Sequence, residues 1–118
     1  DHINAHATST VAGDASEVQG IIAALGADRA SAIAVSATKS MHGHCLGATG
    51  ALEAALTTLA IAHQIVPPTI NYTTPDPDCD LDYVPHEARR TTVRHAMSTS
   101  VGLGGHNSSI VFARWDGA

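Results

Sequence analysis

Three short segments of the sequence contain residue types that often take part in catalysis or binding. They are residues 4–10 (NAHATST), residues 36–48 (SATKSMHGHCLGA) and residues 102–107 (GLGGHN). The first two contain His6 and His44, and the second also holds Lys39, the only lysine of the chain. An imidazole can exchange a proton near neutral pH, but a single histidine on a strand is more often structural than catalytic. The residue types alone leave both interpretations open.

Other kinds of site fit the spacing of these residues less well. His42, His44 and Cys45 lie close together, but zinc prefers four ligands, and no second pair follows at a suitable distance. Cys45 precedes a predicted helix, where a thiol becomes more acidic, so it is a candidate nucleophile on local grounds. The glycines of residues 102–105 lack the third spaced glycine of a dinucleotide-binding loop. We therefore expect neither a metal ion nor a cofactor.

The pattern of apolar residues predicts that each of the three segments follows or joins strands. Strands are expected at residues 2–8, 33–38, 94–98 and 108–114, the last two forming a hairpin. Open α/β sheets bind their ligands in the loops beyond the strand ends. The expected fold class is therefore α/β, with helices covering a mixed sheet.

Two helices are expected between these strands. Asp14 and Glu17 resemble a capping box that begins a helix ending at Gly26. The longest predicted helix covers residues 47–64 and is ended by the Pro67-Pro68 pair. It presents an apolar stripe on one face, formed by Leu52, Leu56 and Leu59. Residues 39–47 and 71–82 are expected to be loops.

The composition excludes several classes of protein. The formal net charge of −5 over 118 residues disfavours a nucleic-acid-binding protein, which would carry a basic stripe. No window of eighteen residues is continuously apolar, and the first residues lack the order of a signal peptide. Two cysteines do not make a disulfide framework, so free thiols in a reducing cytoplasm are expected. The start without methionine suggests a piece of a larger enzyme.

Four motifs together resemble one enzyme family. They are NAHATST, TKSMHGHCLGATGALEA, PPTINYTTPDPDCDLDYVP and VGLGGHN, in this order along the chain. They are similar to the β-ketoacyl-[acyl-carrier-protein] synthases, and especially to the type II elongating condensing enzymes. The resemblance implies half of a thiolase-like fold, with residues 1–118 forming the C-terminal domain. The nucleophilic cysteine of such enzymes lies in the N-terminal half, so this chain alone is expected to be inactive.

The resemblance also implies an activity and roles for individual residues. The activity is acyl transfer in fatty-acid biosynthesis, by decarboxylative Claisen condensation of malonyl-carrier-protein with an acyl-enzyme. His6 and His44 correspond to the imidazoles that stabilise the developing enolate, and Lys39 to an active-site lysine. The remaining implied roles are an ion pair between Lys39 and Glu53, pantetheine binding by Thr8 and Thr10, and an oxyanion-hole loop at Leu103 and Gly104. Cys45 is then a packing residue.

The chain departs from the family at Val101 and Leu103, where phenylalanines are usual. This leaves open a different class of function, a non-catalytic partner subunit that resembles a chain-length factor. The expected partners are acyl carrier protein, its phosphopantetheine-linked acyl and malonyl groups, and a second copy of the full-length protein. Since carrier proteins are acidic, the arginines at 89, 90 and 94 are a candidate docking site. A solvated loop is an equal alternative for them.

Overall fold

A mixed four-stranded sheet forms the centre of the computed structural model, which describes residues 1–117. The strand order is β2-β1-β5-β6. Strand β1 (His2–Asn4) runs parallel to β2 (Ala34–Ser36) and to β5 (His95–Val101), and β5 pairs antiparallel with β6 (Asn107–Ala113). The predicted α/β class with a mixed sheet is therefore confirmed, as is the closing hairpin.

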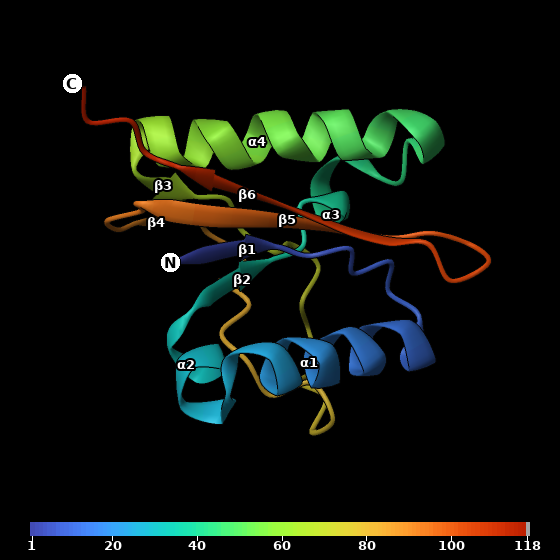
Figure 1. Cartoon of the computed structure of the whole chain (residues 1–118). Helices are drawn as coiled ribbons and strands as arrows, with labels where there is room; N and C mark the ends of the chain where they lie inside the picture. Colours follow the sequence, from blue (N-terminus) through green and yellow to red (C-terminus); the bar gives the residue numbers. More distant parts are fainter. Residues whose placement is uncertain (118) are drawn as a thin grey trace.

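Helices cover both faces of this sheet (Figure 1). Helices α1 (Val11–Leu25) and α2 (Ala27–Ala32) lie on one face, and α4 (Thr49–His63) lies on the other. The connection from β2 to α4 contains the short helix α3 (Lys39–His42) and the 3-10 turn η1 (Leu46–Ala48). A second sheet consists of β3 (Ile65–Val66) and β4 (Arg89–Arg90). Residues 39–47 are thus partly helical, contrary to the expected loop.

The core consists of two small aliphatic clusters, one on each face of the sheet. One includes Ile3 and Val35 with Ile21 from α1, and the other includes Ala96 and Val93 with Ile61 from α4. Because the chain has so few aromatic residues, both clusters are built from branched aliphatic side chains and alanine. Among the described residues, no helix is long and apolar enough to cross a membrane.

The expected N-terminal capping box of the first helix is wrong. Helix α1 begins at Val11, with Thr10 before it, and no side chain caps its first turn. Asp14 and Glu17 lie inside the helix, and the carboxylate of Glu17 binds backbone N–H groups of another segment. The predicted end at Gly26 is correct, since Gly26 has a positive φ of 82° and its N–H donates to the carbonyl of Ile22.

The expected leucine stripe of the longest predicted helix is also wrong. Leu59 is 49% exposed, and Leu52 and Leu56 are only partly buried. Helix α4 buries a different and largely polar face, formed by Thr49, Glu53, Thr57, Ala60 and Ile61. Polar groups from β1 and α3 lie opposite this face and hydrogen-bond to it, which a hydrophobic pattern cannot reveal. Helix α4 ends at His63, before the two prolines, and the next residue, Gln64, has a left-handed backbone conformation.

Candidate functional site

The backbone around His6 is held by the carboxylate of Glu17. The N–H groups of His6 and Ala7 donate to Glu17 Oε1 and Oε2, each over 2.8 Å. The hydroxyl of Thr99 on β5 also donates to Oε1, over 2.7 Å. Ala7 has a positive φ of 28°, a conformation that residues other than glycine rarely adopt. Two charge-assisted hydrogen bonds therefore hold a strained turn that directs the His6 ring.

The ring of His44 is held by the residues that follow it. Its Nδ1 accepts the backbone N–H of Leu46 over 3.0 Å and lies 3.1 Å from the hydroxyl oxygen of Thr49. Because an N–H group can only donate, Nδ1 of His44 carries no proton in this arrangement. In the neutral ring the proton is then on Nε2, which is left available as a hydrogen-bond donor.

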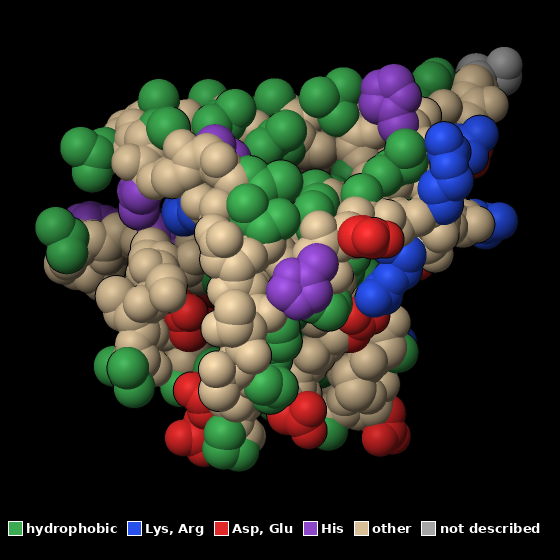
Figure 2. Space-filling view, turned by 180° about the vertical axis from the view of Figure 1, so that it is seen from behind, with side chains coloured by type: hydrophobic (Ala, Val, Ile, Leu, Met, Phe, Trp, Pro, Cys, Tyr) green, Lys and Arg blue, Asp and Glu red, His purple; other side chains and the backbone are tan. Residues whose placement is uncertain are grey.

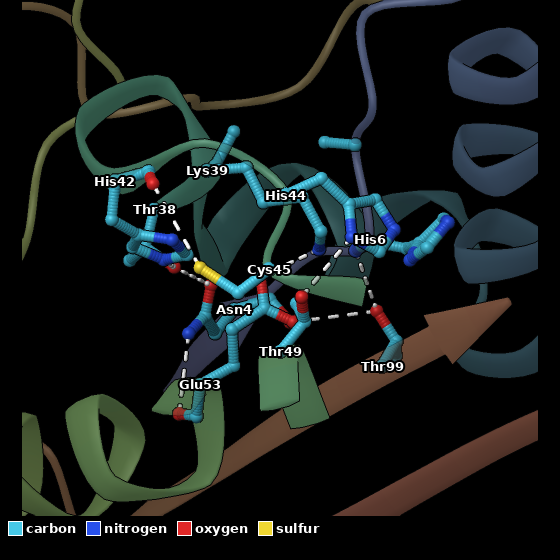
Figure 3. A network of polar contacts seen from close by, with 12 residues as sticks. Asn4, His6, Thr38, Lys39, His42, His44, Cys45, Thr49, Glu53 and Thr99 are labelled. Atoms are coloured by element: carbon cyan, nitrogen blue, oxygen red, sulfur yellow. Dashed lines mark hydrogen bonds and ion pairs between the residues drawn. The ribbon is translucent and has the colours of Figure 1, made fainter. Parts of the chain in front are cut away.

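The two rings lie edge to face beside one another (Figure 3). Their centroids are 5.6 Å apart, and their planes make an angle of 86°. Burial is the main cause that lowers the pKa of His6, and the positive charge of Lys39 and the neighbouring His44 lower it further, whereas Glu17 raises it. The net lowering of the pKa favours the neutral form of His6 at pH 7.

Lys39 and Glu53 form a buried ion pair, as the resemblance implied. Nζ of Lys39 lies 2.5 Å from Oε1 of Glu53, and the two residues are 7% and 0% exposed. Such burial is tolerated because each charge offsets the other. Asn4 on β1 joins the pair to the sheet, since its side-chain amide donates to the backbone carbonyl of Glu53.

The two threonines expected to bind pantetheine lie on the turn before α1. Their Oγ1 atoms are 3.5 Å apart. Thr10 lines a cavity of about 340 Å³ between α1 and the segment of residues 69–83, whereas Thr8 is not among its lining residues. The structure therefore brings the two hydroxyl groups together, and of the two only Thr10 lines this cavity.

The glycine-rich segment forms the tip of the β5–β6 hairpin. Gly104 and Gly105 have positive φ values of 81° and 83°, and the N–H of Gly102 donates to the carbonyl of His106. The side chain of Leu103 is 99% exposed. Within the described residues, no hydrogen bond joins this tip to His6 or His44.

The arginines considered for docking lie at the other end of the sheet from these histidines. The backbone N–H of Arg94 donates to the carboxylate of Asp1, which precedes β1, whereas His6 lies beyond the other end of β1, after Asn4 and Ala5. The guanidinium of Arg89 is paired with Asp82. In Figure 2 most of the blue Lys and Arg side chains lie near one edge of the molecule, whereas another blue group lies on the opposite side beside histidine side chains.

Sequence reasoning missed the residues that hold the two histidines. Glu17 was assigned to a capping box, and Thr49 and Thr99 were given no role, because no local pattern marks a long-range hydrogen bond. Cys45 is exposed and unpaired, with its Sγ 4.0 Å from the carbonyl oxygen of His42. In residues 1–117, no cluster of three or more His, Cys, Asp or Glu side chains could hold a metal ion.

Comparison with known families gives a clear result. Residues 1–73 match the family described as "Beta-ketoacyl synthase, C-terminal domain". The chain belongs to the β-ketoacyl synthase family. It is 54% identical over 114 residues to "3-oxoacyl-[acyl-carrier-protein] synthase 2" of Synechocystis sp., and 49% identical over 113 residues to the protein of the same name from Vibrio harveyi. These alignments cover 97% and 96% of this chain but 27% of each relative.

Solved ketosynthase structures share the fold. The ishigamide ketosynthase/chain length factor superposes with a TM-score of 0.92 at 39% identity, over 98% of this chain and 28% of that one. A β-ketoacyl synthase from Burkholderia phymatum gives a TM-score of 0.87 at 40% identity, over 97% of this chain and 27% of that one. The expected thiolase-like architecture is thereby confirmed. The chain spans about 27% of the length of the curated relatives that it matches.

Proposed function

We propose that this chain supplies the decarboxylation site of a β-ketoacyl-[acyl-carrier-protein] synthase of fatty-acid biosynthesis, an acyltransferase. The observation that carries the proposal is the pair of facing imidazoles, with the His44 proton directed to Nε2 and His6 favoured in its neutral form. Two neutral rings of this kind can donate hydrogen bonds to one developing negative charge.

The proposed reaction uses these donors when malonyl thioester loses carbon dioxide. The carbon–carbon bond to the carboxylate breaks, and its electron pair moves into an enolate whose oxygen becomes negative. The Nε2–H of His44 and a ring N–H of His6 stabilise that oxygen. The enolate carbon then attacks the acyl thioester of a cysteine outside this chain, forming the new carbon–carbon bond and releasing the thiolate.

The other site residues have supporting roles in this proposal. Lys39 provides a fixed positive charge, and Glu53 balances it. The two side chains are buried, with Nζ of Lys39 2.5 Å from Oε1 of Glu53, which supports a role in the electrostatics of the site and in positioning. Thr8 and Thr10 bind the pantetheine chain through their hydroxyl groups. The backbone of Leu103 and Gly104 completes the oxyanion hole for the acyl thioester once the hairpin tip is packed against the rest of the enzyme.

Further protein surface is needed to complete this site, and we propose that residues 1–118 act as the C-terminal domain of a two-half synthase. Strand β6 is at the edge of the sheet, and Val111 on it is exposed, as are Leu59 on α4 and Trp115 beyond β6. Exposed apolar edges of this kind require cover in a stable protein. We propose that an N-terminal half with the nucleophile covers part of them and that the whole enzyme is a cytoplasmic homodimer.

Acyl carrier protein is the proposed partner. A similar structure is a type II PKS acyl-carrier protein in complex with its ketosynthase, with a TM-score of 0.91 at 43% identity. The superposition covers 95% of this chain and 27% of the chain that it matches. The position of the arginines beyond the start of β1, away from His6, argues against docking at residues 89–94. The synthase names of the curated relatives do not favour the alternative of a non-catalytic partner subunit.

The test is to replace each imidazole in the whole synthase. His6→Ala and His44→Ala should each lower the rate of malonyl-carrier-protein decarboxylation about 10²–10³-fold, since each removes one oxyanion donor. His63→Ala is the matched control, because His63 is an exposed residue at the end of α4. Normal decarboxylation in either active-site variant would remove that histidine from the mechanism. The 118-residue chain alone should form no condensation product, and any product would refute the two-half proposal.

A further inference from the structure

Thr10 occupies the position of a helix cap but does not cap its helix. Its backbone is extended, with φ of −108° and ψ of 135°, and its carbonyl accepts the N–H of Asp14 in the first turn of α1 over 2.9 Å. At this position a threonine hydroxyl usually accepts a backbone N–H two or three residues later. The side chain of Thr10 makes no such hydrogen bond. Its hydroxyl group is therefore not used to stabilise the helix.

The hydroxyl of Thr10 instead faces that of Thr8. The two Oγ1 atoms lie 3.5 Å apart, and within residues 1–117 no hydrogen bond joins either of them to a third group. This distance is long for a hydrogen bond between hydroxyl groups, so a closer acceptor can replace the contact. The two hydroxyl groups carry two protons, and their mutual contact uses only one of them. At least one proton is thus available to a carbonyl oxygen of a bound ligand.

Gly13 leaves open the space in which the Thr10 hydroxyl lies. A Cβ atom added to Gly13 would overlap Oγ1 of Thr10. The same Cβ atom would lie 3.7 Å from Cβ of Thr10 and 3.9 Å from Oγ1 of Thr8, which are ordinary van der Waals distances. The conflict is thus confined to one oxygen atom. Rotation about the Cα–Cβ bond of Thr10 would relieve it, but this rotation would turn the hydroxyl away from its present position.

A second glycine of the same helix provides a comparison. Gly20 also lies in α1, and a Cβ atom added there would lie in open space. Alanine is more favourable than glycine inside a helix, so helix formation requires glycine at neither position. The two glycines differ because only Gly13 has a functional group of another residue in the place of its missing side chain.

We propose that Gly13 is a positioning residue for the pantetheine chain, because the space beside it keeps the Thr10 hydroxyl turned toward Thr8. This proposal rests on the proposed binding of pantetheine by the two threonines. Thr10 lines the cavity of about 340 Å³ between α1 and residues 69–83, so space for a ligand adjoins it. The amide carbonyls of pantetheine are acceptors for a hydroxyl proton. A side chain at position 13 should therefore weaken the binding of this chain.

The first test uses the 118-residue chain and needs no substrate. In Gly13→Ala, the three-bond NMR coupling constants of Thr10 should show a changed side-chain rotamer, whereas Gly20→Ala should leave them unchanged. Both variants should resist denaturant at least as well as the wild type, because alanine favours the helix. An unchanged Thr10 rotamer in Gly13→Ala would refute the positioning role. Lower stability of Gly13→Ala would show that this glycine serves folding, and would overturn the proposal as well.

The second test measures binding in the whole synthase, with malonyl-pantetheine as the substrate. Gly13→Ala should raise the KM for decarboxylation about fivefold and leave kcat within about twofold, since it removes one hydrogen bond to the chain and none to the reacting atoms. Gly20→Ala is the matched control and should change neither constant. Equal KM values for the wild type and Gly13→Ala would overturn the proposal.

A double variant distinguishes this proposal from the proposed function. Thr10→Ala removes the hydroxyl, so it should raise KM by a similar factor, and the addition of Gly13→Ala should have no further effect. A further rise of KM in the double variant would show that position 13 does not act through Thr10, and would refute the positioning role. A normal KM in Thr10→Ala would instead refute the binding of pantetheine by Thr10, on which the proposal rests.

Discussion

The turn that carries His6 and the tip of the β5–β6 hairpin differ in how they are held. Both follow strands of the same sheet, and both contain residues with positive φ. These residues are Ala7 in the first turn and Gly104 and Gly105 in the hairpin tip. At the first, the carboxylate of Glu17 binds two successive backbone N–H groups. At the second, Leu103 is 99% exposed. The backbone at His6 is therefore held by contacts inside this chain, whereas the Leu103 side chain at the hairpin tip has almost no contact inside it.

This difference divides the proposed site into two parts with different requirements. The decarboxylation part consists of His6, His44 and the Lys39–Glu53 pair, which this chain positions by itself. Within the described residues, the proposed acyl-binding part at Leu103 and Gly104 has no carboxylate that holds it, and its turn is closed only by the hydrogen bond from Gly102 to His106. Substitutions in the first part should therefore disturb the chain itself, and those in the second should leave it unchanged.

The largest effect is expected from Glu53→Ala. It leaves the ammonium group of Lys39 buried without its partner, which typically costs about 3–5 kcal/mol of unfolding free energy. Denaturant unfolding of the 118-residue chain measures this loss. The double variant Lys39→Met/Glu53→Leu is the control, and it should be more stable than Glu53→Ala because it buries no unpaired charge. A change below about 1 kcal/mol in Glu53→Ala would show that the pair is not needed for stability.

A smaller effect is expected from Glu17→Gln. The amide places an NH₂ group where a carboxylate oxygen accepted a backbone N–H, so at least one charge-assisted hydrogen bond is lost. The expected loss is about 1.5–3 kcal/mol of unfolding free energy, measured in the same way. Glu87→Gln is the matched control, since Glu87 is exposed. Equal stability of the two variants would contradict the difference drawn between the two turns.

The stability of the chain should also decrease as the pH falls below the ordinary pKa of histidine. His2 is 1% exposed, donates from Nδ1 to the carbonyl of Ala34, and has no partner at Nε2. Burial is the main cause that lowers its pKa, so the unfolded chain binds a proton more readily than the folded one. Stability is then complete above about pH 6.5 and is lost as the pH falls.

Denaturant unfolding at about pH 7.5 and about pH 5 measures this dependence. A His2→Gln variant, which has no titrating ring, should lose part of it, while the exposed His63→Gln should retain it. A dependence that is identical in wild type and His2→Gln would exclude His2 as its source.

The smallest effect is expected from Leu103→Ser. Since the side chain is almost fully exposed in this chain, the unfolding free energy should change by no more than about 0.5 kcal/mol. In the whole synthase the same substitution keeps the backbone N–H but removes the apolar side chain by which we propose that the tip packs against the rest of the enzyme, so it should lower acyl transfer from acyl-carrier-protein more than malonyl decarboxylation. A loss of stability in the isolated chain would mean that the hairpin tip is packed within it, and the comparison between the two turns would fail.

The sequence by itself was sufficient to predict the fold class and the four strands of the main sheet, although β1 is shorter than predicted and the two short strands β3 and β4 were not predicted. Alternation of apolar residues marked β1 and the closing hairpin, and Gly26 marked the end of α1, because these signals depend on neighbours in the chain. The ion pair of Lys39 with Glu53 followed from the resemblance of the motifs to a known family.

Only the tertiary structure decided which face of α4 is buried and what holds each histidine. The leucines of α4 are less buried than Thr49, Glu53 and Thr57, because groups of β1 and α3 provide hydrogen bonds to that polar face. Glu17 meets the N–H of His6 only after α1 has folded back along the sheet. Hydrogen bonds between distant segments leave no periodic trace in a sequence, so the geometry of the site could not be predicted from it.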